Sequence, residues 1–559
     1  MEYAAFLAVV AGLLFIFILT GKMEEKKARQ FLRSRLQKQY GNYSDKQYAD
    51  GRMESMKSGI RCAEERFRID DITWNDLEMD RVFRTIDFTR SSAGEEALYR
   101  WLRIPEFDGQ ALSEREKHFR FFETHEKDRL DYLMLMSEVG RTGKYSVYDY
   151  LDYLEALPEK NCLITKVLDV LMTACLVLGI AVNGYFFVPA VGLLLYHMLT
   201  YMQQKKEVEP YLMTFSYFVR ILDSVKKLHR MSDGFQQEFE KEIAQIQREK
   251  AELAAFRRFS FLALDYDAGS TPMDITRIIL SYFNMIFHLD LLKLYSMLHV
   301  IKEKKQMLIM LLRHMGEIES CISVVYARAA FGEYTEPKLI QQRQDEICME
   351  TEEMFHPLLQ DPVKNSFCQR RGMLLTGSNA SGKSTFLKTV ALNALFAQTI
   401  HTVCARTYRA GYFRIYSSMA LRDSLQQGES YFIVEIKSMK RIFDAAEKEG
   451  APVLCTIDEI LRGTNTAERI GAGTELLKAL CRKGVLCFAA THDLELTVLL
   501  KEDMDNYHFE EWVKGKEIQF PYQLTEGCAT GRNAIKLLGA LGFDQELVQR
   551  AEKLAGGMM

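Results

Sequence analysis

"LLTGSNASGKSTFLKT", residues 374–389, decides the fold of the carboxyl-terminal part of this chain. It contains the pattern G-x-x-x-x-G-K-[ST], from Gly377 to Ser384. "GMLLTG" before the pattern reads as a buried strand bounded by glycines. The residues after it repeat at the i, i+3, i+4 spacing of a helix packed on a sheet: Leu387, Val390, Ala391, Ala394 and Leu395. A phosphate-binding strand–loop–helix unit is therefore predicted.

The loop predicts a site for ATP and Mg²⁺. Its glycines let backbone N–H groups surround phosphates, and the helix start adds positive potential. Lys383 is expected to reach the terminal phosphates and to assist catalysis, and Ser384 to ligate Mg²⁺. The predicted nucleotide-binding residues are Gly377, Ser378, Asn379, Ala380, Ser381, Gly382, Lys383, Ser384 and Thr385.

Two further apolar runs supply candidate catalytic groups. "APVLCTIDEI", residues 451–460, predicts a strand that ends with Asp458 near the metal and Glu459 near the γ-phosphate. Glu459 would act as the general base on the attacking water, although surface Asp-Glu pairs are also common after core strands. "GVLCFAATHDLELT", residues 484–497, predicts a third strand followed by His492, which would contact the γ-phosphate, although a lone histidine after a strand is more often incidental. The order of these motifs matches ABC-type ATPases.

Composition gives little indication of a partner. The formal net charge is −4, so any nucleic-acid contact would need a local basic patch. The 11 cysteines include no C-x-x-C pair, and no His/Cys cluster has the spacing of a zinc site. Reduced thiols are therefore expected, and a structural zinc site is not.

The first residues favour a membrane anchor over residues 1–21. Tyr3 to Thr20 carry no charge, and basic residues follow from Lys22. A cleaved signal peptide is the alternative, but it would have a basic start and a small-residue cleavage site. The positive-inside rule then leaves the following chain in the cytoplasm.

A second apolar block predicts a transmembrane hairpin over residues 163–203, with spans at about 163–182 and 186–202. Asn183-Gly184 would form its turn. Lys166 and Asp169 favour the alternative of a buried helical hairpin. A third stretch, residues 278–301, is expected to be a packed cytoplasmic helix. The prediction is a multi-pass membrane protein of about three spans, in contact with lipid, whose ATPase domain is cytoplasmic.

The remaining segments are expected to be helical before residue 340 and α/β from residue 350. Helical regions are predicted over 22–160 and 204–340, and an α/β domain over 350–559. Within the first region, Leu98, Trp101 and Leu102 fall on one helical face, and Pro105 ends that run.

Taken together, these motifs resemble the MutS family of DNA mismatch repair ATPases. The resemblance rests on "TGSNASGKST", "DSLQQGESYFIVEI" (423–436), "DEILRGTNTAERIGAG" (458–473), "ATHDLELT", "FHPLL" (355–359) and the closing "IKLLGALGFDQELVQRAEKL". It implies an ABC-type P-loop ATPase domain at the carboxyl terminus, preceded by a mostly helical core and lever domain. It also implies a homodimer with composite sites, in which Ser430 reaches the nucleotide of the other subunit.

The chain also departs from that family. The family's mismatch-reading and connector domains have no room before the core-like segment, and the loop has Asn-Ala-Ser where mismatch sensors commonly have Asn-Met-Gly. ATP hydrolysis and dimerisation are thus implied more directly than recognition of a mismatch or a branched DNA structure. Tyr522, in "FPYQLTEG", is a candidate to stack on adenine, or it is an ordinary hairpin aromatic.

Three functional hypotheses follow. The first is a membrane-anchored MutS-like ATPase coupled to DNA, with basic residues of 22–38 contacting either DNA phosphates or anionic lipid. The second is an ATP-driven membrane or protein-interaction switch that no longer acts on DNA. An ABC transporter subunit is disfavoured, because an LSGGQ-type signature is missing and three spans are few for a transport path.

Overall fold

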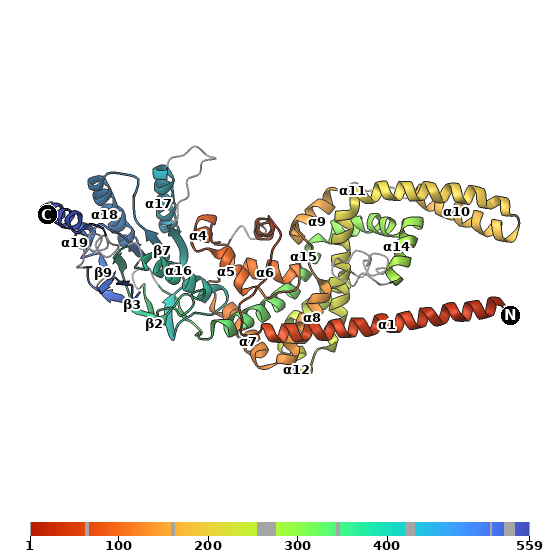
Figure 1. The fold of residues 1–559 in the computed structure, drawn as a ribbon, viewed down its shortest axis with the longest axis horizontal. Coiled ribbons are helices and arrows are strands. Elements are labelled where there is room, and N and C mark those ends of the chain that lie inside the picture. Colours follow the sequence, from red (N-terminus) through yellow and green to blue (C-terminus); the bar gives the residue numbers. More distant parts are fainter. Residues whose placement is uncertain are drawn as a thin grey trace. The chain divides into compact units, whose positions relative to one another are not determined.

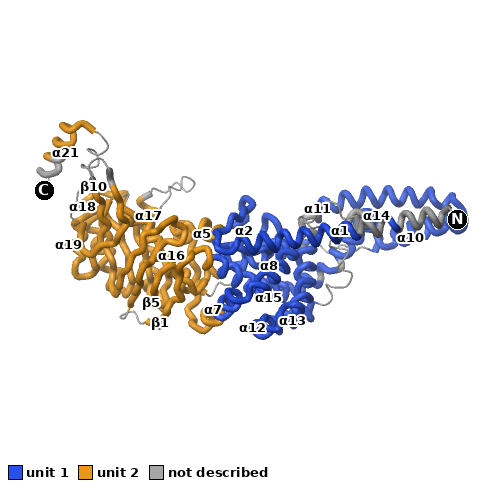
Figure 2. Tube along the Cα trace, turned by 60° about the horizontal axis from the view of Figure 1, so that its bottom comes forward, with its two compact units in different colours: residues 1–63, 86–100, 117–327 blue, residues 64–85, 101–116, 328–559 orange. Residues whose placement is uncertain are grey.

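The structure, a computed structural model, contains two compact units. It describes residues 2–61, 66–157, 163–253, 275–342, 347–378, 381–419, 431–514, 517–529 and 543–557. Unit 1 comprises residues 1–63, 86–100 and 117–327, and unit 2 comprises residues 64–85, 101–116 and 328–559 (Figure 2). Unit 2 thus includes two segments that lie within the helical region predicted over 22–160.

The described part of unit 1 is helical (Figure 1). Its helices are α1 (Glu2–Gln39), α2 (Arg52–Met56), α3 (Ser58–Arg61), most of α6 (Ser92–Arg103), α8 (Glu126–Val139), α9 (Val147–Ala156), α10 (Leu163–Ala181), α11 (Phe187–Lys227), α12 (Asp233–Glu238), α13 (Glu240–Glu252), α14 (Ile275–Phe287) and most of α15 (Leu289–Phe331).

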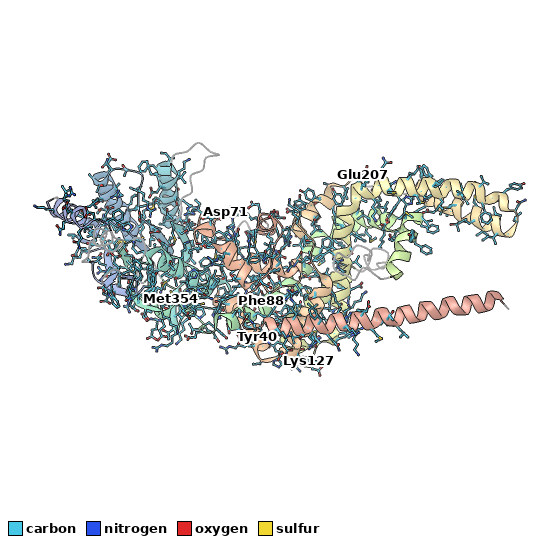
Figure 3. All side chains as sticks on the ribbon, in the orientation of Figure 1. Tyr40, Asp71, Phe88, Lys127, Glu207 and Met354 are labelled. Atoms are coloured by element: carbon cyan, nitrogen blue, oxygen red, sulfur yellow. The ribbon has the colours of Figure 1, made fainter. Side chains whose placement is uncertain are left out.

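Aromatic packing and small residues hold the core of unit 1 together. Tyr40 and Phe88, labelled in Figure 3, contact Tyr326 with ring centroids 5.2 and 5.0 Å apart. A Cβ atom on Gly94 of α6 would lie 2.1 Å from Glu319 Oε2 of α15, so a larger residue there would displace the Glu319 carboxyl. The Glu319 carboxyl is fully buried, and burial raises its pKa to about 7.

The predicted hairpin forms two helices, α10 and α11, joined at Asn183. Two segments in the described part of the chain are long and apolar enough to cross a membrane, Leu163–Ala181 and Gly184–Val208. Only 11% and 17% of their apolar windows are buried in the protein, so most of these side chains are exposed. Such exposure disfavours the alternative of a buried hairpin. α11 continues well past the predicted end, to Lys227.

The structure adds detail to one helical prediction and corrects another. α1 runs without a break from Glu2 to Gln39, so the helix continues past Gly21, where the predicted anchor ends. Most side chains of its apolar half lie outside those that the structure describes. The single packed helix expected over 278–301 is two helices, because His288 adopts a left-handed backbone (φ 51°) between α14 and α15. Tyr282 and Phe283 of α14 are exposed.

A six-stranded sheet forms the centre of unit 2. The strand order is β12-β9-β4-β8-β7-β6, with β12 antiparallel to β9 and the other pairs parallel. The strands are β4 (Gly372–Thr376), β6 (Arg414–Ser418), β7 (Val453–Asp458), β8 (Val485–Ala490), β9 (Met504–Phe509) and β12 (Leu524–Glu526). The strands predicted before the loop, before Asp458 and before His492 are therefore present as β4, β7 and β8.

Smaller sheets and several helices complete unit 2. A four-stranded sheet has the order β1-β5-β2-β3, and β10 pairs with β11. These strands are β1 (Lys338–Ile340), β2 (Met349–Met354), β3 (Asn365–Gln369), β5 (Thr407–Gly411), β10 (Trp512–Lys514) and β11 (Glu517–Gln519). The helices are α4 (Asp71–Asp76), α5 (Met79–Ile86), the first half of α7 (Gly109–Thr124), α16 (Lys383–Thr399), α17 (Tyr431–Glu447), α18 (Thr466–Arg482), α19 (Glu495–Leu499) and α21 (Gln545–Gly557).

The apolar stripe predicted after the loop is the buried face of α16. Leu387, Val390, Ala391, Ala394 and Leu395 are all at most 1% exposed. Every residue of β4 and β8 is buried, as expected for parallel strands that are covered on both faces.

Segment 64–85 is fixed to the sheet by buried polar contacts. The Asp76 carboxylate accepts hydrogen bonds from Ser417 Oγ at 2.6 Å and from the Met419 N–H at 3.0 Å. Thr73 Oγ1 accepts from the Ser417 N–H at 3.1 Å. These bonds place α4 against the end of β6. Leu98, Trp101 and Leu102 of α6 are buried on one face, as predicted.

Candidate functional site

The loop after β4 and the start of α16 form the first part of the site. Gly377 and Gly382 have φ angles of 140° and 100°, where a side chain is strained. A Cβ atom on Gly377 would lie 2.8 Å from the Phe509 carbonyl oxygen, and one on Gly382 would lie 2.9 Å from Tyr522. Both glycines are therefore needed for this loop path.

Lys383 points back into its own loop. Its Nζ donates to the carbonyl oxygens of Gly377 at 2.6 Å and Ser378 at 2.7 Å. Burial lowers the pKa of this ammonium group to about 8, although nearby carboxylates oppose the shift. Ser381 Oγ also donates to the Ser378 carbonyl, at 2.8 Å. The loop thus holds its lysine close to the place where the pattern predicts phosphate.

The first residues of α16 meet the end of β7. Ser384 Oγ donates to Asp458 Oδ2 at 2.6 Å. This contact exists because β7 and β4 are parallel strands of one sheet, separated only by β8, so their carboxyl ends lie at one edge. A hydroxyl and a carboxylate at hydrogen-bond distance are the hard oxygen ligands that Mg²⁺ prefers, so these two residues fit that ion.

The residue after Asp458 is held by the side chains of His492 and Arg462. The Glu459 carboxylate lies 2.7 Å from His492 Nε2 and also forms an ion pair with Arg462. These two contacts outweigh burial and lower the pKa of Glu459 to about 2, so the carboxylate is charged at neutral pH. Glu459 and Leu461 both have positive φ angles, 59° and 56°. Such strain in non-glycine residues is concentrated at functional sites.

Tyr522 lies beside the loop rather than in a remote hairpin. It lines a cavity of about 410 Å³ together with Gly382, Ser384, Thr385 and His356. The Asn365 amide holds the Tyr522 segment by donating to the Tyr522 carbonyl at 3.1 Å and accepting from the Leu524 N–H at 2.7 Å. A pocket of this size suits a small organic ligand.

The structure brings together the predicted residues that it describes: Gly377, Ser378, Ser381, Gly382, Lys383, Ser384, Thr385, Asp458, Glu459, His492 and Tyr522. Asn379, Ala380 and Ser430 lie outside the described residues.

Four neighbours of the site were not singled out from sequence. Arg462 could have been suspected, since it lies three residues after Glu459 in a turn already noted. Glu511, which accepts from Ser378 Oγ at 2.5 Å, gives no local signal, and neither does Asn365. His356 lines the cavity, and burial lowers its pKa to about 4, so it is neutral at pH 7.

The sheet, the glycine-containing loop and the Ser384–Asp458 pair define the class: an α/β domain in which a strand, a glycine-containing loop and a helix follow one another. Residues 373–559 match MutS domain V. This match and the relatives below support a MutS-family protein.

Several similar proteins are described as DNA mismatch repair protein MutS. The chain is 28% identical to that of Thermotoga petrophila over 264 residues, 45% of this chain and 32% of the relative. It is 30% identical to that of Persephonella marina over 217 residues, 37% and 25% of the two chains. It is 34% identical to that of Oleidesulfovibrio alaskensis over 195 residues, 33% and 21% of the two chains. The match thus spans about a fifth to a third of the length of these relatives.

Proposed function

We propose that the protein is an ABC-type ATPase of the MutS family that binds ATP with Mg²⁺ and hydrolyses it. The observation that carries this proposal is the convergence of three strand ends on one loop. Ser384 bonds to Asp458, and Glu459 bonds to His492, all at the edge where β4, β7 and β8 end. An α/β sheet places its ligands at this edge.

In this proposal the loop binds the phosphates of ATP. Lys383 exchanges the carbonyl oxygens of Gly377 and Ser378 for phosphate oxygens, which accept from the same ammonium group and carry a full negative charge. The first turn of α16 adds N–H groups and positive potential. Ser384 and Asp458 hold Mg²⁺, which offsets charge on the phosphates when it is bound. Tyr522 covers the adenine from the adjoining cavity.

Glu459 is the proposed general base. It accepts a proton from the attacking water as the new O–P bond forms and the bond to the leaving ADP oxygen breaks. Both of its oxygens are engaged, one by His492 and the other by Arg462. One of these contacts must open before the carboxylate can orient water. His492 then remains close enough to contact the γ-phosphate.

The family match supports two further parts of the proposal. The first is a homodimer with composite sites, in which Ser430 approaches the nucleotide of the second subunit. The second is coupling of hydrolysis to DNA binding, which rests on relatives described as DNA mismatch repair proteins. The apolar, exposed helices α10 and α11 support attachment to a membrane, with the amino-terminal segment as an additional anchor and the ATPase domain in the cytoplasm.

The exposed hairpin also favours a second candidate function. An ATP-driven switch that acts on a membrane or a protein partner would use α10 and α11 as its output and would not need DNA.

The test is the ATPase rate of full-length protein purified in detergent, measured alone and with homoduplex, mismatched and branched DNA. Stimulation by one DNA structure supports the DNA-coupled function and identifies its substrate. A flat response to DNA with stimulation by anionic vesicles supports the switch instead. If Mg²⁺-dependent hydrolysis is absent under all of these conditions, the ATPase proposal fails.

A further inference from the structure

A second cluster of candidate ligands lies in unit 1. Asp169 of α10, His197 of α11 and His288, between α14 and α15, offer ligand atoms that lie within 4.8 Å of one another. His197 and His288 are 91 positions apart in sequence, which explains why spacing alone did not reveal them. Both histidines are buried, at 1% and 2% exposure.

The distances suit one metal ion. His197 Nδ1 lies 3.2 Å from His288 Nδ1 and 3.5 Å from Asp169 Oδ1. Two ligands bound at about 2.0–2.1 Å to a tetrahedral Zn²⁺ are separated by roughly 3.3–3.4 Å. The two observed separations lie on either side of that value, so these atoms match two edges of a tetrahedral coordination shell.

A hydrogen bond fixes the tautomer of one ligand. Thr200 Oγ1 donates its only hydrogen to the backbone carbonyl oxygens of Tyr196, at 2.9 Å, and His197, at 3.1 Å. It therefore accepts from His288 Nε2, which lies 3.3 Å away. With Nε2 protonated, His288 Nδ1 carries a lone pair directed into the cluster. Metal-binding histidines are held in the same way, through a hydrogen bond from the other ring nitrogen.

Polar atoms around the cluster lack ordinary partners. Within the residues that the structure describes, Asp169 Oδ1, His197 Nε2 and both amide atoms of Asn284, one helical turn before His288, are buried and have no hydrogen-bond partner. Leaving such atoms unpaired is costly, and each one in a native protein calls for a ligand, an ion or a water. An ion bound by Asp169 Oδ1 would remove one of these costs.

The backbone of His288 gives a separate indication. Its φ angle of 51° is unfavourable for a residue with a side chain, and its N–H bonds to the Asn284 carbonyl at 2.8 Å. A glycine or asparagine would adopt this turn more easily. A histidine that is held there against local preference indicates that its imidazole is needed at that place.

Two members of the cluster lie in apolar segments, where ionisable side chains without a functional role would only cost free energy. Asp169 and His197 belong to the two apolar segments that are long enough to span a membrane. His197 lies about 20 Å along its helix from the turn at Gly184, at 1.5 Å per residue. Ionisable residues within such segments are rare and mark functional sites.

We propose that Asp169, His197 and His288 bind one divalent transition-metal ion of the Zn²⁺ class. The three side chains supply a His₂Asp set and leave a fourth position open for water or an exogenous ligand, an arrangement found in catalytic rather than purely structural zinc sites. The ion links α10, α11 and the α14–α15 junction, so its binding fixes the α10–α11 hairpin to that junction. This proposal is independent of the ATPase site, since the two share no residue.

The experiment measures Zn²⁺ bound to full-length protein in detergent, without nucleotide. We expect one ion per chain, and a loss of affinity of at least about tenfold in each of Asp169→Asn, His197→Gln and His288→Asn. Asparagine at position 288 tolerates the left-handed backbone, so that variant keeps the fold. His229→Gln, at an exposed histidine, and Asp458→Asn, at the proposed Mg²⁺ site, should bind like the unmodified protein.

Binding of Zn²⁺ by the three ligand variants as tight as by the unmodified protein would overturn the proposal. So would loss of the ion in Asp458→Asn alone. Co²⁺ supplies a measurement that needs no substitution: an intense visible spectrum of four-coordinate Co²⁺ with nitrogen and oxygen ligands supports the site. The weak spectrum of hydrated, six-coordinate Co²⁺ refutes it. ATP hydrolysis is read in parallel, so failure of one proposal is distinguishable from failure of the other.

Discussion

Substitution of Glu459 by glutamine separates nucleotide binding from hydrolysis. The amide keeps the size and planarity of the carboxylate, and it removes the proton acceptor. Arg462 can only donate hydrogen bonds, so the glutamine oxygen must face Arg462 and its NH₂ group must face His492. His492 then accepts through Nε2, at the position where it now lies 2.7 Å from the carboxylate. The site therefore keeps its shape.

The expected cost lies in the chemical step. Loss of a positioned general base typically lowers a rate by about 10²–10⁴-fold, which corresponds to roughly 3–5.5 kcal/mol of activation free energy. Binding of ATP should change little, since Lys383, Ser384 and Asp458 are untouched and lose none of their contacts.

Single-turnover hydrolysis and equilibrium binding of a fluorescent ATP analogue measure the two quantities separately. Glu475→Gln, an exposed substitution on α18, is the matched control and should behave like the unmodified protein. A Glu459→Gln variant that hydrolyses ATP at the unmodified rate would show that Glu459 is not the base. One that fails to bind ATP would show that the carboxylate has a structural role in the pocket.

The Arg462→Ala variant should raise the Glu459 pKa from about 2 toward its ordinary value, because a cation that favours the charged form is lost. The acidic limb of the pH–rate profile for ATP hydrolysis should then move to higher pH. An unmoved limb would contradict the proposed role of this ion pair. Tyr522→Ala should weaken ATP binding by ~1–3 kcal/mol, because the aromatic ring that covers the adenine is lost. Tyr522→Phe should bind ATP nearly as the unmodified protein does. Isothermal titration calorimetry measures both affinities, and equal values would show that Tyr522 does not contact the adenine. Arg328→Met should destabilise unit 2 by about 3–5 kcal/mol, because Arg328 makes two hydrogen bonds to the buried Glu116 carboxylate, at 3.0 and 2.6 Å. Burial opposes ionisation of Glu116, but its contacts with His401 and Arg328 outweigh burial and lower the Glu116 pKa to about 2, so the stabilisation is present above its ordinary pKa near 4.5 and is lost as pH falls through about 2. Urea unfolding at neutral pH and at about pH 3 should show that the free energy of unfolding depends less on pH in Arg328→Met than in the unmodified protein. An unchanged pH dependence would show that the Arg328–Glu116 pair is not its source.

Local sequence patterns predicted the centre of the α/β fold well. The strand before Gly377 and the helix after it depend on glycine conformation and on apolar spacing. Both can be recognised in a stretch of about twenty residues of sequence. The same holds for the strands that end at Asp458 and before His492. The contact between Ser384 and Asp458 follows from parallel strand order once both strands are recognised.

Local sequence patterns could not predict the contacts between segments that are far apart in the sequence. Nothing near Ser378 indicates that Glu511 will accept its hydroxyl, and nothing near Asn365 indicates that it will hold the Tyr522 segment. The break at His288 was missed because periodicity is the same on both sides of it, and one residue with a positive φ angle changes the direction of the chain without changing the apolar pattern.

The attachment of α4 to β6 has a consequence for how the protein is made. Thr73 and its partner Ser417 are 344 positions apart, and Asp76 depends on the same strand. At a synthesis rate of about 5–20 residues per second, the ribosome needs roughly 20 s to one minute to pass from one to the other. During that interval the short amphipathic helices α4 and α5 exist without the strand that buries them. The unit that carries the proposed ATPase therefore cannot fold one segment after another during synthesis. Its folding is complete only after β6 has been made and has packed against α4.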